Sequence, residues 1–259
     1  AGHNGLVGRA LIRAIEARPD LEWIGATRSE LDLLDGEAVQ SFLEQNSPDL
    51  ILMAAAKVGG IGANDKYPVE FLLDNLTIQN NLMKSAHEVG TKKLVFLGSS
   101  CIYPKFCEQP IKEEYLMTGP LEPSNSGYAV AKIAGIEMIN SYRKEYGLKW
   151  ISLMPTNLYG PRDNFDLKAS HVLPALIRRF IEALESNAKS VTLWGSGSPL
   201  REFLHVSDMA EASLFVLELD EETYQANTKP MLSHINVGTG KDVTNKIGYV
   251  ATNLLENMF

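Results

Sequence analysis

The fold is decided by the stretch Lys93-Leu94-Val95-Phe96-Leu97-Gly98-Ser99-Ser100-Cys101. Its first half is a short apolar segment that stops at Gly98, a pattern typical of a strand buried in a parallel sheet. Open α/β sheets bind their ligands in the crevice at the carboxyl ends of the strands. We therefore expect Ser99 and Cys101 to enter a ligand crevice.

A tyrosine and a lysine, Tyr128 and Lys132, lie four residues apart in a segment, 128–145, whose pattern predicts a helix. Residues at i and i+4 share one helix face. A free tyrosine has a pKa of roughly 10, and a neighbouring ammonium should lower the pKa toward the range that a general acid needs. The serine at the strand end can donate a hydrogen bond to a substrate oxygen that becomes an alkoxide. The alternative is an ordinary surface pair on an amphipathic helix.

The N-terminus carries a glycine pattern, GxxGxxG, ahead of a helical segment. Such glycines permit a tight turn and let the backbone approach a pyrophosphate at the helix N-terminus. The strand that should precede the pattern is missing, so we expect the sequence to be a fragment that begins one strand late. The predicted cofactor contacts from this turn are Gly2, His3, Asn4, Gly5, Leu6, Val7 and Gly8.

Cofactor choice is indicated by Arg28, which follows a predicted strand at residues 22–27. An acidic residue near this place binds the 2′-hydroxyl of NAD(H), whereas an arginine accommodates the 2′-phosphate of NADP(H). Arg28 therefore favours NADP(H). The acidic residues Glu30 and Asp32 lie close by, and a solvated loop arginine is the alternative.

The order of the other elements predicts an α/β fold, a Rossmann-like doubly wound parallel sheet with a smaller C-terminal substrate lobe. Further strands are expected at residues 49–56, 150–154, 191–197, 201–206 and 234–238, and further helices at 38–43, 67–86, 171–185, 208–219 and 247–258. We assign residues 1–160 to the NADP-binding Rossmann domain. We expect residues 161–259 to form mostly a substrate-binding lobe with returning Rossmann elements, incomplete at its end.

Composition narrows the possible partners. The 259 residues carry a net charge of -8, which gives no basic footprint for nucleic acid. Two cysteines do not make a disulfide framework, which favours a reducing, cytoplasmic compartment. No apolar run is long enough to span a membrane. The histidines show no metal-ligand spacing, so we expect no metal.

The glycine turn, Ser99 and Tyr128-x-x-x-Lys132 resemble the extended short-chain dehydrogenase/reductase family. Longer phrases at residues 54–61, 97–104, 154–161 and 201–206 are similar to family members that act on GDP-4-keto-6-deoxy-mannose. Those members epimerise C3 and C5 and then reduce C4. The resemblance runs from the first residue to about Thr244 and implies NADP(H), a GDP-sugar substrate and a homodimer through the helices at 71–86 and 128–146.

The resemblance also implies residue roles. It makes Ser99, Tyr128 and Lys132 the reductase triad, and Cys101 and His171 the epimerisation pair. The chemistry agrees, because a C4 ketone acidifies the hydrogens on C3 and C5, and a thiol and an imidazole can serve as base and acid near neutral pH. The implied cofactor-lining residues are Leu97, Gly98, Ser99, Ser100, Lys132, Pro155, Thr156, Asn157, Leu158 and His171. The implied substrate contacts are Arg179, Trp194 and Arg201.

Other interpretations stay open at this level. Cys101 could be a small buried hydrophobe and His171 an ordinary helix-start histidine. The chain could be a related nucleotide-sugar 4-epimerase or 4,6-dehydratase, although a dehydratase usually needs a carboxylate pair where Ser100 and Cys101 stand. A fragment that binds nucleotide without turnover is the third possibility.

Overall fold

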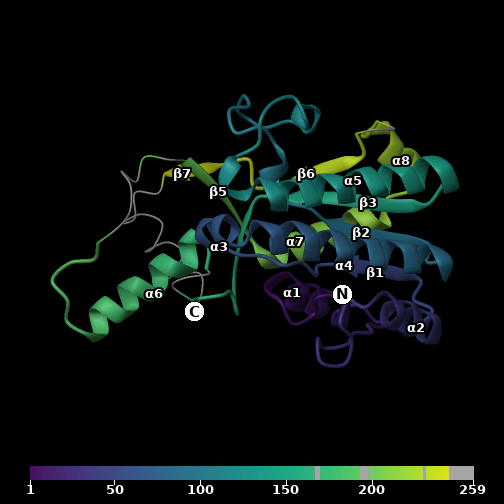
Figure 1. The fold of residues 1–259 in the computed structure, drawn as a ribbon, viewed down its shortest axis with the longest axis horizontal. Coiled ribbons are helices and arrows are strands. Elements are labelled where there is room, and N and C mark those ends of the chain that lie inside the picture. Colours follow the sequence, from purple (N-terminus) through teal and green to yellow (C-terminus); the bar gives the residue numbers. More distant parts are fainter. Residues whose placement is uncertain (167–169, 193–197, 199, 230–231, 245–259) are drawn as a thin grey trace.

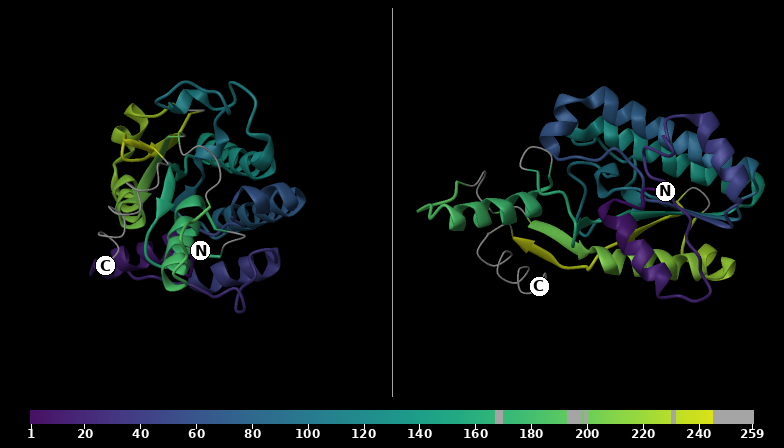
Figure 2. Two further views of the ribbon diagram at one scale, coloured as in Figure 1. Left: turned by 90° about the vertical axis from the view of Figure 1, so that its left-hand side faces the viewer. Right: turned by 90° about the horizontal axis from the view of Figure 1, so that it is seen from below.

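A parallel four-stranded sheet lies at the centre of the computed structural model, which describes residues 1–166, 170–192, 198, 200–229 and 232–244. Its strand order is β1-β2-β3-β6, and each neighbouring pair is parallel. Helices cover both faces of the sheet (Figures 1 and 2). The predicted doubly wound fold is therefore confirmed. The strands are β1 Leu50–Met53, β2 Lys93–Leu97, β3 Lys149–Pro155 and β6 His234–Val237.

Each face of the sheet has its own apolar core. One core, against α2, α4 and α5, contains Phe96, Trp150 and Met154, and the other, against α1 and α7, contains Val95 and Leu153. Neighbouring strand residues thus point to opposite cores, and that is why β2 and β3 read as continuous apolar runs. The helices are α1 Leu6–Glu16, α2 Gly36–Asn46, α4 Pro68–Glu88, α5 Ser126–Tyr146 and α7 Val206–Glu218.

Local signals fix the helix ends. Asp35 caps α2, since its side chain accepts hydrogen bonds from the backbone N–H groups of Glu37 and Ala38. Pro68 opens α4 at the first turn, where its missing N–H costs nothing. Helix α5 is followed by its C-cap Gly147, which has a φ of 65°.

A second, smaller sheet has the order β4-β5-β7, with β4 Asn157–Tyr159, β5 Leu200–His205 and β7 Asp242–Thr244. Helix α6, Val172–Glu185, extends away from the main sheet on the same side of the molecule (Figure 1). The short segments are α3 Ile61–Lys66, α8 Glu221–Ala226, and single 3-10 turns η1 Ser100–Ile102, η2 Glu113–Tyr115 and η3 Pro123–Asn125.

Residues 22–27, expected as a strand, are irregular. An extended segment becomes a strand only when a neighbour takes up its backbone hydrogen bonds. Among the described residues, the outer edge of β1 carries only Ala1, which bonds the Leu52 carbonyl and the Ala54 N–H. The segment therefore has no strand to pair with, and Trp23 and Ile24 stay exposed. Most of the strand expected at 191–197 and the helix expected at 247–258 lie outside the described residues.

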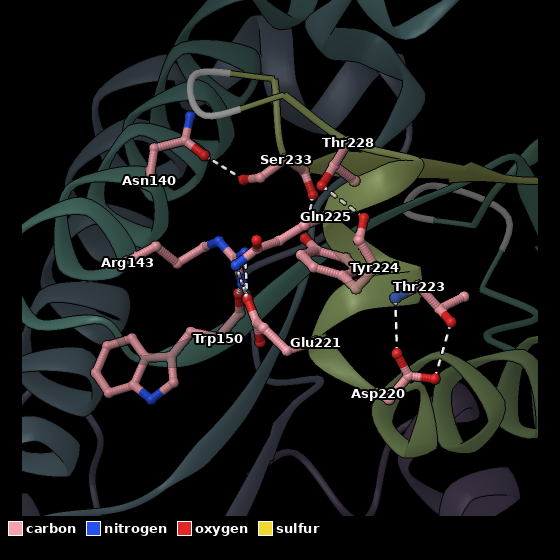
Figure 3. Close-up of polar contacts among 10 residues, drawn as sticks. All are labelled: Asn140, Arg143, Trp150, Asp220, Glu221, Thr223, Tyr224, Gln225, Thr228 and Ser233. Atoms are coloured by element: carbon pink, nitrogen blue, oxygen red, sulfur yellow. Dashed lines mark hydrogen bonds and ion pairs between the residues drawn. The ribbon is translucent and has the colours of Figure 1, made fainter.

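Arg143 joins α5, β3 and α8 at the amino-terminal end of the sheet (Figure 3). Its guanidinium donates to the Trp150 carbonyl at 3.0 Å, pairs with Glu221 at 3.3 Å and lies 4.5 Å from the centre of the Tyr224 ring. The Tyr224 hydroxyl donates to the Ser233 carbonyl just before β6. This cluster holds the far end of α5, whose near end carries Tyr128 and Lys132.

Candidate active site

Lys132 lies beneath Tyr128 at the carboxyl end of β2. The lysine is buried, and its Nζ donates to the Leu97 carbonyl at 2.8 Å. The same Nζ is 5.7 Å from the centre of the Tyr128 ring and 4.8 Å from that of Phe96. The predicted i, i+4 pair on α5 thus faces the end of the strand, as expected.

Ser99 connects the tyrosine to the cysteine. Its hydroxyl lies beside both the Tyr128 phenol and the Cys101 thiol, and it lowers the pKa of each. The thiol itself sits in the turn η1, directly after the strand. The structure therefore brings four of the five predicted catalytic side chains together: Ser99, Cys101, Tyr128 and Lys132.

The pKa of Tyr128 differs from the sequence-based expectation. Burial raises it, the charge of Cys101 raises it further, and the bond to Ser99 only partly opposes this. Burial also lowers the pKa of Lys132 to about 8, so the lysine is a weaker source of positive charge than expected. Tyr128 is consequently a protonated phenol near neutral pH, the form that can give a proton to an alkoxide.

Cys101 is also protonated near neutral pH. Burial raises the pKa of its thiol above the ordinary value of 9.0, although the bond from Ser99 and the nearby Lys132 lower it. Only a minor thiolate fraction is then present at pH 7. A rate that depends on this thiolate should rise as the pH increases.

The glycine turn is closely packed at two positions and open at the third. A Cβ at Gly2 would lie 2.6 Å from the Ala55 nitrogen, and one at Gly8 would lie 2.1 Å from the Gly2 oxygen. At Gly5 the nearest atom would be 3.4 Å away, so that side of the turn is open. Two glycines thus allow close packing and the third leaves room for a ligand at the N-terminus of α1.

The surroundings of Arg28 are compatible with the predicted contact to a 2′-phosphate. Arg28 is exposed, and it forms no ion pair with a carboxylate in the described part of the chain. The nearby acid Glu30 instead accepts hydrogen bonds from the backbone N–H and the hydroxyl of Thr27, both at 2.7 Å. The competing carboxylate is therefore already engaged within its own turn.

Sequence reasoning missed two asparagines that hold the loop after β1. Buried Asn75 on α4 accepts from the Lys57 N–H at 2.9 Å and donates to the Lys57 and Phe71 carbonyls. Asn64 donates to the Gly59 carbonyl at 2.8 Å. The Phe71 ring meets the Tyr128 ring edge-on at 6.4 Å, which links this loop to the catalytic tyrosine. A mid-helix asparagine is a poor helix former, and this signal could have identified Asn75.

The segment after β3 is tied to β5. Pro155 is buried, and Thr156 and Asn157 both donate side-chain hydrogen bonds to the Glu202 carbonyl, at 3.1 and 2.9 Å. Leu158 packs into the core beside α7. The polar side chains predicted to line the cofactor are therefore used to join the two sheets.

The remaining predicted residues lie on the second lobe. His171 is exposed at the start of α6. Burial raises the pKa of Asp163, and the charge of His171 only partly opposes this. No interaction between His171 and Cys101 is seen among the described residues. Arg179 is partly buried on α6, and Arg201 is exposed on β5. Trp194 lies outside the described residues.

The described part of the chain has neither a metal-binding cluster nor a membrane-spanning helix. No group of three or more His, Cys, Asp or Glu side chains there is arranged to hold a metal ion. No helix in that part is both long enough and apolar enough to cross a membrane.

Comparison with known proteins gives consistent results. The model of the NAD dependent epimerase/dehydratase family matches residues 1–238. GDP-L-fucose synthase of Escherichia coli (strain K12) is 55% identical over 244 residues, which cover 94% of this chain and 76% of that protein. GDP-L-fucose synthase 1 of Arabidopsis thaliana is 52% identical over 244 residues, which cover 94% of this chain and 73% of the relative.

Solved structures with the same fold were crystallised with NADPH or NADP. A GDP-D-glycero-L-gluco-heptose synthase of Campylobacter jejuni, crystallised in the presence of NADPH, superposes with a TM-score of 0.90 at 34% identity, over 99% of this chain and 84% of that one. A GDP-L-fucose synthetase of Naegleria fowleri bound to NADP gives 0.82 at 31% identity, over 98% and 80%.

Proposed function

The chain belongs to the NAD dependent epimerase/dehydratase family, and we propose that it converts GDP-4-dehydro-6-deoxy-D-mannose to GDP-L-fucose with NADPH. The conversion consists of epimerisation at C3 and C5 followed by reduction of the C4 ketone. The observation that carries this proposal is the gathering of Ser99, Cys101, Tyr128 and Lys132 at the carboxyl end of β2. A plain ketoreductase needs the serine and the tyrosine, whereas the thiol beside them adds a group for chemistry at the neighbouring carbons.

The cofactor would be held by the glycine turn through its pyrophosphate and by Arg28 through its 2′-phosphate. NADPH, when bound, supplies the hydride for C4. Tyr128 gives its proton to the C4 oxygen, and its raised pKa keeps that proton in place until the oxygen becomes basic. Ser99 donates a hydrogen bond to the same oxygen. Lys132, fixed by the Leu97 carbonyl, orients the phenol and stabilises its charge once the proton has left.

Epimerisation comes first, while the C4 ketone still acidifies its neighbours. Cys101 removes a proton from C3 or C5, and His171 returns one on the opposite face. Support for the thiol comes from its place beside Ser99 and Lys132. For His171 the support is its position at the start of α6, together with Arg179 on the same helix. Residues 1–160 would then bind the cofactor, and residues 161–259 would mostly bind the GDP-sugar, with Arg179, Trp194 and Arg201 as its contacts.

Two variants test whether different residues carry out epimerisation and C4 reduction. Tyr128→Phe should still exchange the C3 and C5 hydrogens with solvent deuterium but oxidise little NADPH. Cys101→Ser should lose most of the exchange, because a serine hydroxyl is a far weaker base than a thiolate. Cys107→Ser, at the other free cysteine, is the matched control and should behave as the wild type. Intact exchange in Cys101→Ser would remove the epimerase half of the proposal.

We also propose a homodimer in which α4 and α5 of each copy pack together. The outer face of these helices carries exposed apolar side chains, Val69 and Leu73 on α4 and Val130 on α5. Val69 and Leu73 are four apart, so they form one stripe beside the neighbouring helix. Leu73→Arg should convert a dimer to a monomer in light scattering. A monomeric wild-type protein would contradict this proposal.

A reducing compartment such as the cytoplasm is the expected location. Cys101 and Cys107 are both free thiols, and the proposed chemistry needs the first of them unoxidised. Fractionation of cells that express the protein would test the location directly.

A further inference from the structure

A buried polar chain fastens the segment that follows Cys101 to strand β6. Tyr103, two residues beyond the thiol, is almost fully buried, and its hydroxyl donates to the Asn236 Oδ1. The same hydroxyl oxygen lies 3.2 Å from the Nε2 of buried His234. None of these three residues takes part in the proposed reaction.

The direction of each hydrogen bond in this chain can be worked out. The Asn236 Nδ2 donates to the Ile111 carbonyl at 3.2 Å, and this fixes Oδ1 as the acceptor from Tyr103. A tyrosine has a single hydroxyl proton, so its oxygen must accept from His234. His234 therefore carries its proton on Nε2, and Nδ1 is a bare acceptor.

Ser152 lies beside His234 on the neighbouring strand. Ser152 on β3 and His234 on β6 are paired in register, so their side chains leave the same face of the sheet. The Ser152 Oγ and the His234 Nδ1 are both buried, and neither forms a hydrogen bond in the described part of the chain, not even with the other. A serine hydroxyl is a donor and a bare imidazole nitrogen is an acceptor, so the two atoms complement each other.

This buried polar chain of hydrogen bonds also reaches the far end of the loop after Cys101. The Asn236 N–H donates to the Glu113 carboxylate at 2.9 Å, and its side chain holds the Ile111 carbonyl. The near end is held at Tyr103, whose N–H bonds the Ser100 carbonyl across the turn η1. The turn that presents the thiol is thus fixed from strand β6.

From this geometry we propose that Tyr103 and His234 are positioning residues that set the place of the Cys101 thiol for epimerisation. The inference rests on the proposed role of the thiol. Loss of the Tyr103 hydroxyl or of its donor would leave a buried polar group unpaired and loosen the turn η1. Lys132 and Tyr128 are held independently on α5, where Lys132 bonds the Leu97 carbonyl, so proton donation at C4 should suffer less.

The test measures how each variant divides its products. Tyr103→Phe should slow C3 and C5 deuterium exchange about tenfold. A misplacement of roughly 1 Å can cost on the order of 100-fold, and we expect a smaller displacement of the thiol here. The share of unepimerised 6-deoxyhexose product should rise, while the Kd for NADPH stays within about twofold of wild type. His234→Leu should act alike. His234→Gln should recover much of the exchange, since its amide nitrogen can replace Nε2 as the donor.

Tyr115→Phe is the matched control, because Tyr115 lies in the same loop but its hydroxyl only reaches Glu108 at 3.4 Å. If Cys101→Ser abolishes exchange while Tyr103→Phe and His234→Leu match the control, the positioning role is overturned and the proposed function stands. If Cys101→Ser leaves exchange intact, the positioning role falls together with the epimerase half of the proposed function. Should His234→Leu fail to fold, the comparison of Tyr103→Phe and His234→Gln with the control decides the question.

Discussion

Replacing Arg143 by alanine tests how the fold supports the active-site helix. The guanidinium bonds the Trp150 carbonyl, pairs with Glu221 and covers the Tyr224 ring (Figure 3). Its side chain is only 13% exposed. It lies eleven residues after Lys132 on α5, roughly 16 Å along the helix axis, so the loss should be one of stability and not of chemistry.

The size of the effect follows from the three contacts. A hydrogen bond from a charged donor contributes about 1.5–3 kcal/mol. A cation–π contact contributes about 0.5–2 kcal/mol. The ion pair with Glu221, whose side chain is 33% exposed, adds about 1 kcal/mol at most. Because the contacts overlap, we expect Arg143→Ala to lower the free energy of unfolding by about 3 kcal/mol. The melting temperature should then fall by roughly 6–12 °C.

Urea denaturation monitored by circular dichroism measures this loss, and steady-state kinetics below the transition check the active site. Arg18→Ala is the control, because Arg18 pairs with Asp20 and Glu218 at the surface, where ion pairs contribute little. KM for NADPH and for the GDP-sugar should stay at the wild-type values in both variants. A loss no larger for Arg143→Ala than for Arg18→Ala would refute the reasoning.

Three further predictions concern the thiol, Arg28 and the glycine turn. The rate of C3 and C5 deuterium exchange should rise about tenfold per pH unit from pH 7 to 9, because the pKa of Cys101 lies above 9.0 and thiolate forms only as the pH rises. A flat profile would show that the thiolate does not limit exchange. Arg28→Ala should weaken NADPH binding at least tenfold and leave NADH nearly unchanged, as measured by fluorescence titration. Equal losses would remove the 2′-phosphate role. Gly8→Ala should destabilise the fold by about 1–3 kcal/mol, since its Cβ would meet the Gly2 oxygen at 2.1 Å. Gly5→Ala should keep the fold but lose NADPH affinity. A larger loss of stability in Gly5→Ala than in Gly8→Ala would contradict the assigned turn.

The sequence predicts the sheet well because its signals are local. The apolar segment at Lys93–Leu97 and the i, i+4 spacing of Tyr128 and Lys132 both depend on a few neighbouring residues. Residues 22–27 have a similar strand pattern, yet they stay irregular for lack of a pairing strand. Strand formation depends on a distant partner, and no local pattern reports whether that partner is there.

Some features of the candidate site could likewise be predicted from the sequence, and others could not. Sequence spacing could bring Ser99, Cys101, Tyr128 and Lys132 to one place, but it could not weigh burial against charge. A lysine next to a tyrosine suggests a lowered pKa, whereas in the structure desolvation acts on both groups and dominates. The distance from His171 to the thiol depends on how α6 lies against the sheet, which no motif encodes. Two of the three hydrogen bonds of Asn75 go to the backbone of Lys57, 18 residues away, and sequence spacing does not report such a contact.

The most direct test of the proposed function is a single incubation in deuterated water. The protein, NADPH and GDP-4-dehydro-6-deoxy-D-mannose are mixed, and the nucleotide sugar is identified by NMR and mass spectrometry. We predict GDP-L-fucose with deuterium at C3 and C5 and one NADPH oxidised per product. A 6-deoxyhexose with the starting configuration at C3 and C5 and no deuterium there, formed with full NADPH oxidation, would contradict the epimerase assignment and leave only a C4 reductase.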